Sequence, residues 1–158
     1  MGKYQIMDTA NLEAPLIDTR FAPYGALLLR LGLGTMWIAH ALLKVFVFTL
    51  PGTVAFFEKV GFWGPLAYVV VAAELADGIA ILLGIYGRYV SAALIPIMAG
   101  ALMTHLDNGW VFSASGGGWE YPAFLLVASL AHALIGDGAY SLGRDEIPGF
   151  ARPARVAS

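Results

Sequence analysis

Residues 65–84 form an apolar run that carries two carboxylates near its middle. The run reads PLAYVVVAAELADGIAILLG and has about the 20 residues that cross a bilayer as a helix. Glu74 and Asp77 stand three positions apart, so they share one face of that helix. A carboxylate in hydrocarbon is strongly disfavoured unless it is protonated, paired or facing a wet cavity. The span therefore requires neighbouring helices that bring cations or hydrogen-bond donors to the same depth.

The composition indicates a chain that resides in a membrane. Of its 158 residues, 59% are hydrophobic and 13% are charged, far more apolar than a soluble domain of this length. The net charge of -2 and the lack of a basic run argue against nucleic acid as a partner. The sequence has no cysteine, which excludes disulfides, thiolate-held iron–sulfur clusters and covalent c-type haem. Any redox centre that works with this chain must therefore belong to another molecule.

Four apolar stretches predict an all-α membrane protein, a four-transmembrane-helix bundle. The spans are placed at about residues 24–50, 65–84, 89–106 and 120–142. The charged ends are expected to be tails, residues 1–23 and 143–158. The connector at residues 51–64 is rich in aromatic side chains. It is either an amphipathic piece in the headgroup zone or an ordinary surface loop.

Basic residues predict the orientation of the bundle. If both termini are cytoplasmic, the outer connectors hold little beyond Lys44 and Lys59. The cytoplasmic segments then hold Lys3, Arg20, Arg30, Arg88, Arg144, Arg152 and Arg155. Lys and Arg are enriched on the cytoplasmic side of membrane proteins. We therefore predict that both tails are cytoplasmic.

Three polar side chains near the outer ends of their spans are expected to meet. At about 1.5 Å rise per residue, counted from the middle of each span, Lys44, His105 and Glu120 fall roughly 12 to 16 Å toward the outer side. Together they can bind a ligand. Alternatively, Lys44 snorkels to the interface and Glu120 simply leads the fourth helix, where a carboxylate favours the helix dipole.

Glu74 falls close to the midplane together with His132, and His40 lies about 6 Å farther outward by the same count. Lys44 is expected roughly 12 Å outward of Glu74, beyond direct contact unless its long stem reaches inward. We therefore expect desolvation to keep Glu74 protonated, or to make it share its charge through His40 or water. Such a carboxyl is the best candidate for proton handling, because it is retained against a large solvation cost. Asp77 is expected only to hydrogen-bond a neighbouring helix.

Arg30 and Asp137 are the opposite charges of matching depth in the inner half, roughly 9 Å from the middle of their spans. We predict that they pair. A structural ion pair is favoured over a substrate contact, because a buried pair suits the specification of one helix arrangement.

The histidines give no support to a metal or haem site. His40, His105 and His132 lie in different spans, whereas metal sites on bundles usually show paired histidines or Glu-x-x-His on one helix. We therefore expect no metal and no covalently bound cofactor.

Ordered motifs from all four predicted spans resemble the DoxX family of small four-helix membrane proteins. They are RLGLGTMWIAHALLKVF at residues 30–46, AELADGIAILLGIYGR at residues 73–88, HLDNGW and GGGWEY within residues 105–121, and GDGAYSL at residues 136–142. The family's His-Gly-x-x-Lys pattern is matched by His40 and Lys44, with alanine in place of the glycine. Its second-helix glutamate is matched by Glu74, its third-helix histidine by His105, and its Gly-Trp-Glu by residues 118–120.

The resemblance implies a multi-pass protein of the bacterial inner membrane that is associated with redox systems. Relatives in the family include the membrane subunit of thiosulfate:quinone oxidoreductase and a component of a membrane-associated oxidoreductase complex in mycobacteria. We accordingly expect a redox-associated subunit with a quinone or small-anion pocket between its helices. In this hypothesis Glu74 is the catalytic residue that handles protons, and the ligand-binding side chains are His40, Lys44, His105 and Glu120.

Two interpretations stay open. In the first, the chain is a subunit of a quinone-linked oxidoreductase with no redox centre of its own. In the second, it is a non-catalytic structural or docking subunit whose polar interior fixes only its own packing. Both predict the lipid bilayer and other subunits of a membrane complex as partners.

Overall fold

The computed structural model describes residues 18–143 of the chain. Within that range the chain is helical and contains no strand, which confirms the prediction of an all-α protein. The elements are α1 (Ala22–Phe46), α2 (Leu50–Lys59), α3 (Leu66–Leu83), α4 (Gly87–His105), the short 3-10 helix η2 (Leu106–Asn108) and α5 (Glu120–Ile135). The predicted tails lie outside the described residues, apart from residues 18–23 and 143.

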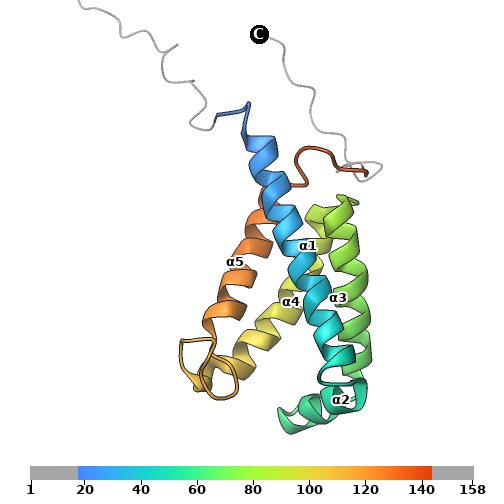
Figure 1. Ribbon diagram of the computed structural model, residues 1–158, viewed down its shortest axis with the longest axis vertical. Helices are drawn as coiled ribbons and strands as arrows, with labels where there is room; N and C mark the ends of the chain where they lie inside the picture. Colours follow the sequence, from blue (N-terminus) through green and yellow to red (C-terminus); the bar gives the residue numbers. More distant parts are fainter. Residues whose placement is uncertain (1–17, 144–158) are drawn as a thin grey trace, which may run out of the picture.

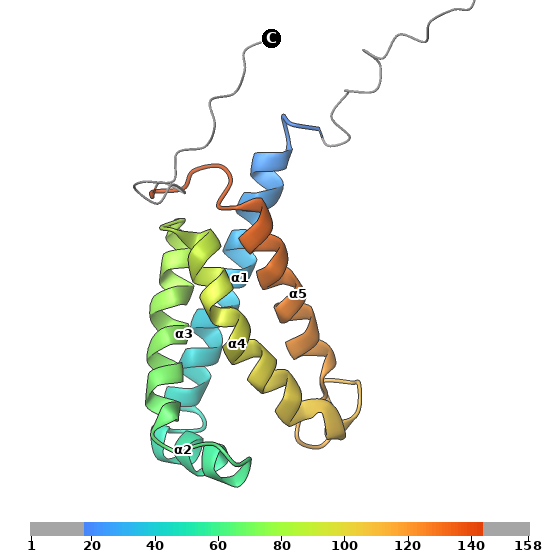
Figure 2. The same cartoon turned by 180° about the vertical axis from the view of Figure 1, so that it is seen from behind.

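The four long helices form an antiparallel bundle. α1 packs against α3, α3 against α4 and α4 against α5, and α1 also contacts α5, which closes the ring (Figure 1). The described chain begins and ends at one end of the bundle, here called the terminal end (Figure 2). The opposite, connector end holds α2 and the loop between α4 and α5. Toward the connector end the α1–α3 pair and the α4–α5 pair diverge in both views.

Three helical segments are long and apolar enough to cross a membrane. They are Ala22–Phe46, Leu66–Leu83 and Gly87–Asn108. α5 is apolar too, but it has only 16 residues. The count of four spans therefore stays a prediction, as does the side on which the terminal end lies.

The first span is shorter than predicted because the chain turns before Pro51. α1 ends at Phe46, and Thr49 adopts a left-handed φ of 63°. The Thr49 hydroxyl then accepts a hydrogen bond of 3.2 Å from Gly52 N and caps the start of α2. A proline in the first turn of a helix is favourable, since the missing N–H would have had no partner there. The connector predicted at residues 51–64 thus contains a helix rather than a plain loop.

The fourth helix also ends earlier than predicted, at Ile135 rather than at residue 142. Gly136 and Gly138 have φ values of 89° and 70°, which leave the helical region. Residues 136–143, here called the closing segment, run across the terminal end instead. Their backbone donates hydrogen bonds to Pro23 O at 3.0 Å, Leu83 O at 3.0 Å and Gly84 O at 2.9 Å. The closing segment therefore joins the ends of α1 and α3.

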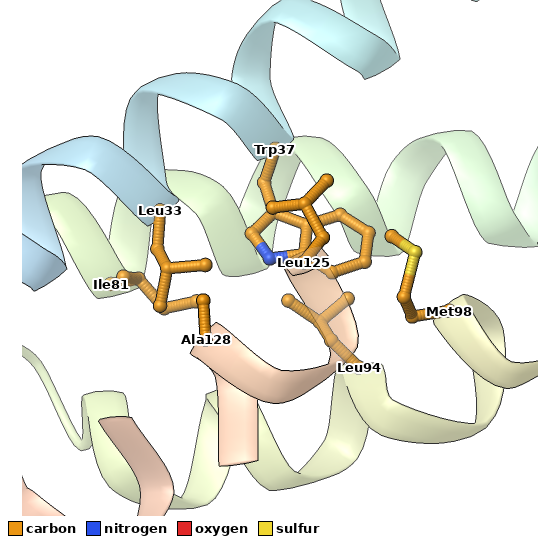
Figure 3. Packing of buried hydrophobic residues seen from close by; sticks show 7 residues of the cluster. All are labelled: Leu33, Trp37, Ile81, Leu94, Met98, Leu125 and Ala128. Atoms are coloured by element: carbon orange, nitrogen blue, oxygen red, sulfur yellow. The ribbon is translucent and has the colours of Figure 1, made fainter. Parts of the chain in front are cut away.

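The core lies where all four helices approach one another. Trp37 is 1% exposed and lies near Leu94, Leu125 and Met98 (Figure 3). α1 and α3 are in backbone contact at Gly34, where an added side-chain carbon would lie 2.8 Å from Leu82 N. Such small residues permit the close helix approach that drives packing in membranes.

Candidate functional site

Lys44 and Glu74 form an ion pair between α1 and α3. The Lys44 ammonium donates hydrogen bonds to Glu74 Oε1 at 2.7 Å and to Oε2 at 2.6 Å. The Glu74 side chain is 4% exposed and that of Lys44 is 21% exposed. Hydrogen bonds between ionised groups are the stronger kind, and here both carboxylate oxygens are engaged. The pair thus keeps the Glu74 carboxylate inside the bundle, with its charge balanced by the Lys44 ammonium.

This contact corrects the predicted depths. Gly78 faces Ile38, because a side-chain carbon added at Gly78 would lie 3.0 Å from Ile38 N. From that level, Glu74 lies four residues along α3, about 6 Å, and Lys44 six residues along α1, about 9 Å. Because the helices are antiparallel, the two positions differ by about 3 Å in depth, not by 12 Å.

The predicted separation failed because the two helices are not centred on the same plane. Gly34, at the middle of α1, lies against Leu82 near the end of α3. α1 therefore extends well beyond α3 at the terminal end. Counting from the middle of each span placed Lys44 too far outward. The expectation that Glu74 lacks a cationic partner is wrong.

His40 lies one helical turn from Lys44 on α1. Its Nδ1 donates a 2.8 Å hydrogen bond to Met36 O, which leaves Nε2 as the nitrogen that can serve a ligand. Its ring stacks on Tyr121 of α5, with centroids 5.1 Å apart and planes 18° apart. Residues four apart share a helix face, so His40 and Lys44 face the same region of the bundle. His40 thereby connects the ion pair to α5.

The expected outer cluster of Lys44, His105 and Glu120 is not brought together by direct contacts. His105 Nδ1 donates to Ala101 O at 2.7 Å. Glu120 Oε1 accepts a hydrogen bond of 2.8 Å from Phe112 N. Among the described residues, no hydrogen bond or ion pair joins either side chain to Lys44. The divergence of the two helix pairs toward the connector end accounts for this result (Figure 2).

Arg30 and Asp137 meet at the terminal end, through the backbone of the closing segment. Arg30 Nη1 donates to Asp137 O at 2.9 Å, and Nη2 donates to Tyr140 O at 3.2 Å. The Asp137 carboxylate accepts a 3.0 Å hydrogen bond from Gly87 N, at the start of α4. Arg30 and Asp137 are 2% and 1% exposed. Both residues therefore act in joining α1, α4 and the closing segment.

His132 belongs to this buried network and not to the surroundings of Glu74, which corrects its predicted place. Its Nε2 lies 3.3 Å from Asp137 Oδ1, and its Nδ1 hydrogen-bonds Ser91 Oγ at 2.7 Å. The predicted depth of His132 assumed a fourth helix that continues to residue 142. Because α5 ends at Ile135, His132 lies in its last turn. Ser91 was not predicted as part of a polar cluster, because the only sequence feature that marks it is a hydroxyl within an apolar helix. With Ser91 and His132 fully buried, this serine–histidine–aspartate arrangement has no access for a substrate.

Asp77 is half-buried on α3 and is absent from the contacts that hold Glu74. Across residues 18–143, no three His, Cys, Asp or Glu side chains gather as they would around a metal ion.

Two comparisons with known proteins find a match. The sequence model of the DoxX family matches residues 25–107. A protein of Bacillus subtilis (strain 168) named "Putative oxidoreductase CatD" is 32% identical over 113 residues, which cover 71% of this chain and 79% of that protein. No solved structure matches the chain.

Proposed function

The chain belongs to the DoxX family of membrane proteins, and from that premise we propose that it is a redox-associated subunit of the bacterial cytoplasmic membrane. In this proposal a quinone head group binds between the helices, beside Lys44, Glu74 and His40. The observation that carries the proposal is the buried Lys44–Glu74 pair, with both carboxylate oxygens within 2.7 Å of the ammonium. Ionisable groups kept inside a membrane bundle mark ligand or proton pathways more often than packing alone.

A neutral quinone fits this pair better than a small anion does. Glu74 neutralises Lys44, so an anion would have to compete with a carboxylate that already makes two hydrogen bonds. A quinone carbonyl needs only a hydrogen-bond donor. The third ammonium proton of Lys44 and, when protonated, His40 Nε2 can supply one each. The similarity to a protein named as an oxidoreductase also supports a quinone as the ligand.

The chain's own share of the chemistry is binding and proton supply. Reduction of a quinone to a quinol consumes two electrons and two protons. We assign the electrons to the redox centre of a partner subunit, because this chain has no cysteine to hold one as a thiolate-bound cluster. In this proposal the Lys44 ammonium donates a proton to the quinone oxygen. The Glu74 carboxylate, which is ionised in the pair, then accepts a proton from water and passes it to the lysine, and a second such cycle supplies the second proton. His105 and Glu120 stay predicted ligand residues, with no contact that links them to this pair.

The test is the quinone content of the purified protein. We expect solvent extraction of the protein from its native membranes to release a bound quinone, measured by chromatography and mass spectrometry. Lys44→Met and His40→Phe should lower the quinone content at least about tenfold, the equivalent of 1.4 kcal/mol in binding. Lys59→Met is the matched control, because Lys59 is an exposed lysine of α2. Thermal melting in detergent confirms that each variant is folded.

Other outcomes would contradict the proposal. If the wild type releases no quinone while a catalytic partner copurifies with it, the non-catalytic docking subunit becomes the better function. If thiosulfate or sulfite binds in a manner that depends on Lys44, while a short-chain quinone does not, the ligand is an anion.

A further inference from the structure

A second candidate binding site lies at the connector end of α5, apart from the Lys44–Glu74 pair. It is a surface depression of about 550 Å³, within the range of roughly 300 to 1,000 Å³ that is usual for small-molecule sites. Its lining is mostly apolar and includes five aromatic side chains and one carboxylate. Four of these aromatic residues and the carboxylate, here called the aromatic cage, are Trp110, Phe112, Trp119, Tyr121 and Glu120.

Two rings of the cage pack against each other edge to face. Trp110 and Trp119 have centroids 4.4 Å apart and planes 84° apart. Tyr121 stacks on His40, with centroids 5.1 Å apart. Trp110 and Phe112 are 52% and 68% exposed, so a ligand can reach them. The depression therefore presents accessible aromatic rings to a ligand.

The carboxylate is fixed within this lining. Glu120 Oε1 accepts the hydrogen bond from Phe112 N at 2.8 Å, which ties the anionic group to the cage. Glu120 also opens α5, where a carboxylate interacts favourably with the helix dipole. Residues 106–121 contain Asp107 and Glu120 but no Lys or Arg. The cage therefore attracts a cation rather than an anion.

The loop that carries the tryptophans is held in one conformation. Trp119 N donates to Gly109 O at 3.1 Å, and Glu120 N donates to Trp110 O at 3.0 Å. Gly118 leaves no room for a side chain, because the carbonyls of Trp110 and Val111 occupy that space. These bonds keep the two indoles beside the start of α5. Preorganised walls of this kind lower the entropic cost of binding.

From these observations we propose that the aromatic cage binds an alkylammonium group. Aromatic faces attract ammonium ions through their negative quadrupole, and cages of several rings select quaternary ammonium groups. Glu120 adds the complementary charge at the rim. The group can belong to a soluble amine such as choline or to a zwitterionic lipid headgroup. In the latter case the acyl chains would follow the exposed Phe124 and Val127 along α5. This proposal does not require a bound quinone, although Tyr121 of the cage stacks on His40 of the proposed quinone site.

Binding of choline to the full-length protein tests the proposal. The protein is placed in nanodiscs of phosphatidylglycerol, a lipid without an ammonium group, and saturation-transfer NMR follows choline chloride. The neutral isostere 3,3-dimethylbutan-1-ol has the shape of choline without its charge. We expect saturable choline binding and at least about tenfold weaker binding of the isostere, from the loss of the cation–π attraction. Equal binding of both compounds, or no saturable choline binding, would overturn the proposal and leave the aromatics as an ordinary interfacial belt.

Variants locate the site. Trp110→Leu should weaken choline binding about tenfold and Glu120→Gln about threefold, whereas Trp63→Leu should leave it unchanged. Trp63 is the matched control because it is 74% exposed and lies outside the cage. If Trp63→Leu weakens binding as much as Trp110→Leu does, the site is not the cage.

A change of the nanodisc lipid distinguishes the two possible sources of the ammonium group. If phosphatidylcholine nanodiscs abolish the choline signal, the lipid headgroup already occupies the cage. If the signal persists there, the ligand is a soluble amine.

Discussion

Lys44 and Glu74 stabilise each other because neither charged side chain is well exposed to water. Glu74 is 4% exposed and cannot reach the membrane surface, whereas Lys44 is 21% exposed and has a long stem that can turn outward. Removing Lys44 therefore leaves a buried carboxylate without a cationic partner. Removing the charge of Glu74 leaves an ammonium whose long stem can extend to the membrane interface. The two single substitutions should have unequal effects on stability.

We predict that Lys44→Met lowers the free energy of unfolding by about 3 kcal/mol, as for a buried pair that loses one partner. Glu74→Gln should lower it by about 1 to 2 kcal/mol, because the lysine can relocate. The double variant should be more stable than Lys44→Met alone, since no unpaired charge remains. Unfolding in mixed detergent micelles, followed by circular dichroism, measures all three. Strictly additive losses would contradict direct pairing.

Glu74 and Lys44 could be singled out from the sequence, but their contact could not. A carboxylate within an apolar span is conspicuous by its solvation cost. Which lysine reaches it depends on the offset between α1 and α3, and that offset is set by the contacts of Gly34 and Gly78, which lie about one turn apart. The same limit explains why His132 was predicted near Glu74 and lies beside Asp137.

Helices α1 and α3 keep their offset through backbone contact at Gly34. Gly34 has Leu82 N at 2.8 Å from a hypothetical side-chain carbon, whereas nothing lies within 4 Å of the corresponding position at Gly32. Both glycines belong to α1, two residues apart. They therefore form a matched pair, in which the same substitution meets either backbone or open space.

We predict opposite effects of alanine at these two positions. Gly34→Ala should lower the free energy of unfolding by about 1 to 3 kcal/mol, because the methyl group forces the helices apart. Gly32→Ala should raise it by up to about 1 kcal/mol, because alanine is the better helix former. The measurement is again unfolding in mixed micelles. A destabilised Gly32→Ala together with an unaffected Gly34→Ala would show that α1 does not pack on α3 at this face.

The helix α3 is the element that its sequence predicts best, with bounds of 65–84 expected and Leu66–Leu83 found. Its helix has no break before Gly84, which adopts a left-handed φ of 67°. The ends of α1 and α5 were placed too late because hydrophobicity continues past the helix. Thr49, Gly136 and Gly138 change the backbone direction within apolar sequence, and hydropathy alone does not detect such turns.

Across the whole bundle, α5 is the shortest of the four long helices. Its 16 residues extend about 24 Å, against a hydrocarbon core of about 30 Å. α1, with 25 residues, extends about 38 Å. A short helix can be accommodated by local thinning of the bilayer or by polar side chains that reach the interface. The closing segment adds length at the terminal end without continuing the helix.

We predict that α5 does span, which places both termini in the cytoplasm. The chain has no cysteine, so single-cysteine variants can be labelled without background. Lys59→Cys and Ser115→Cys, at the connector end, should react with a membrane-impermeant maleimide in intact cells. Ala157→Cys should react only after the membrane is permeabilised, because a fourth crossing returns the chain to the side rich in Lys and Arg. If Ala157→Cys labels in intact cells together with Ser115→Cys, α5 lies on the outer surface and the chain crosses the membrane three times.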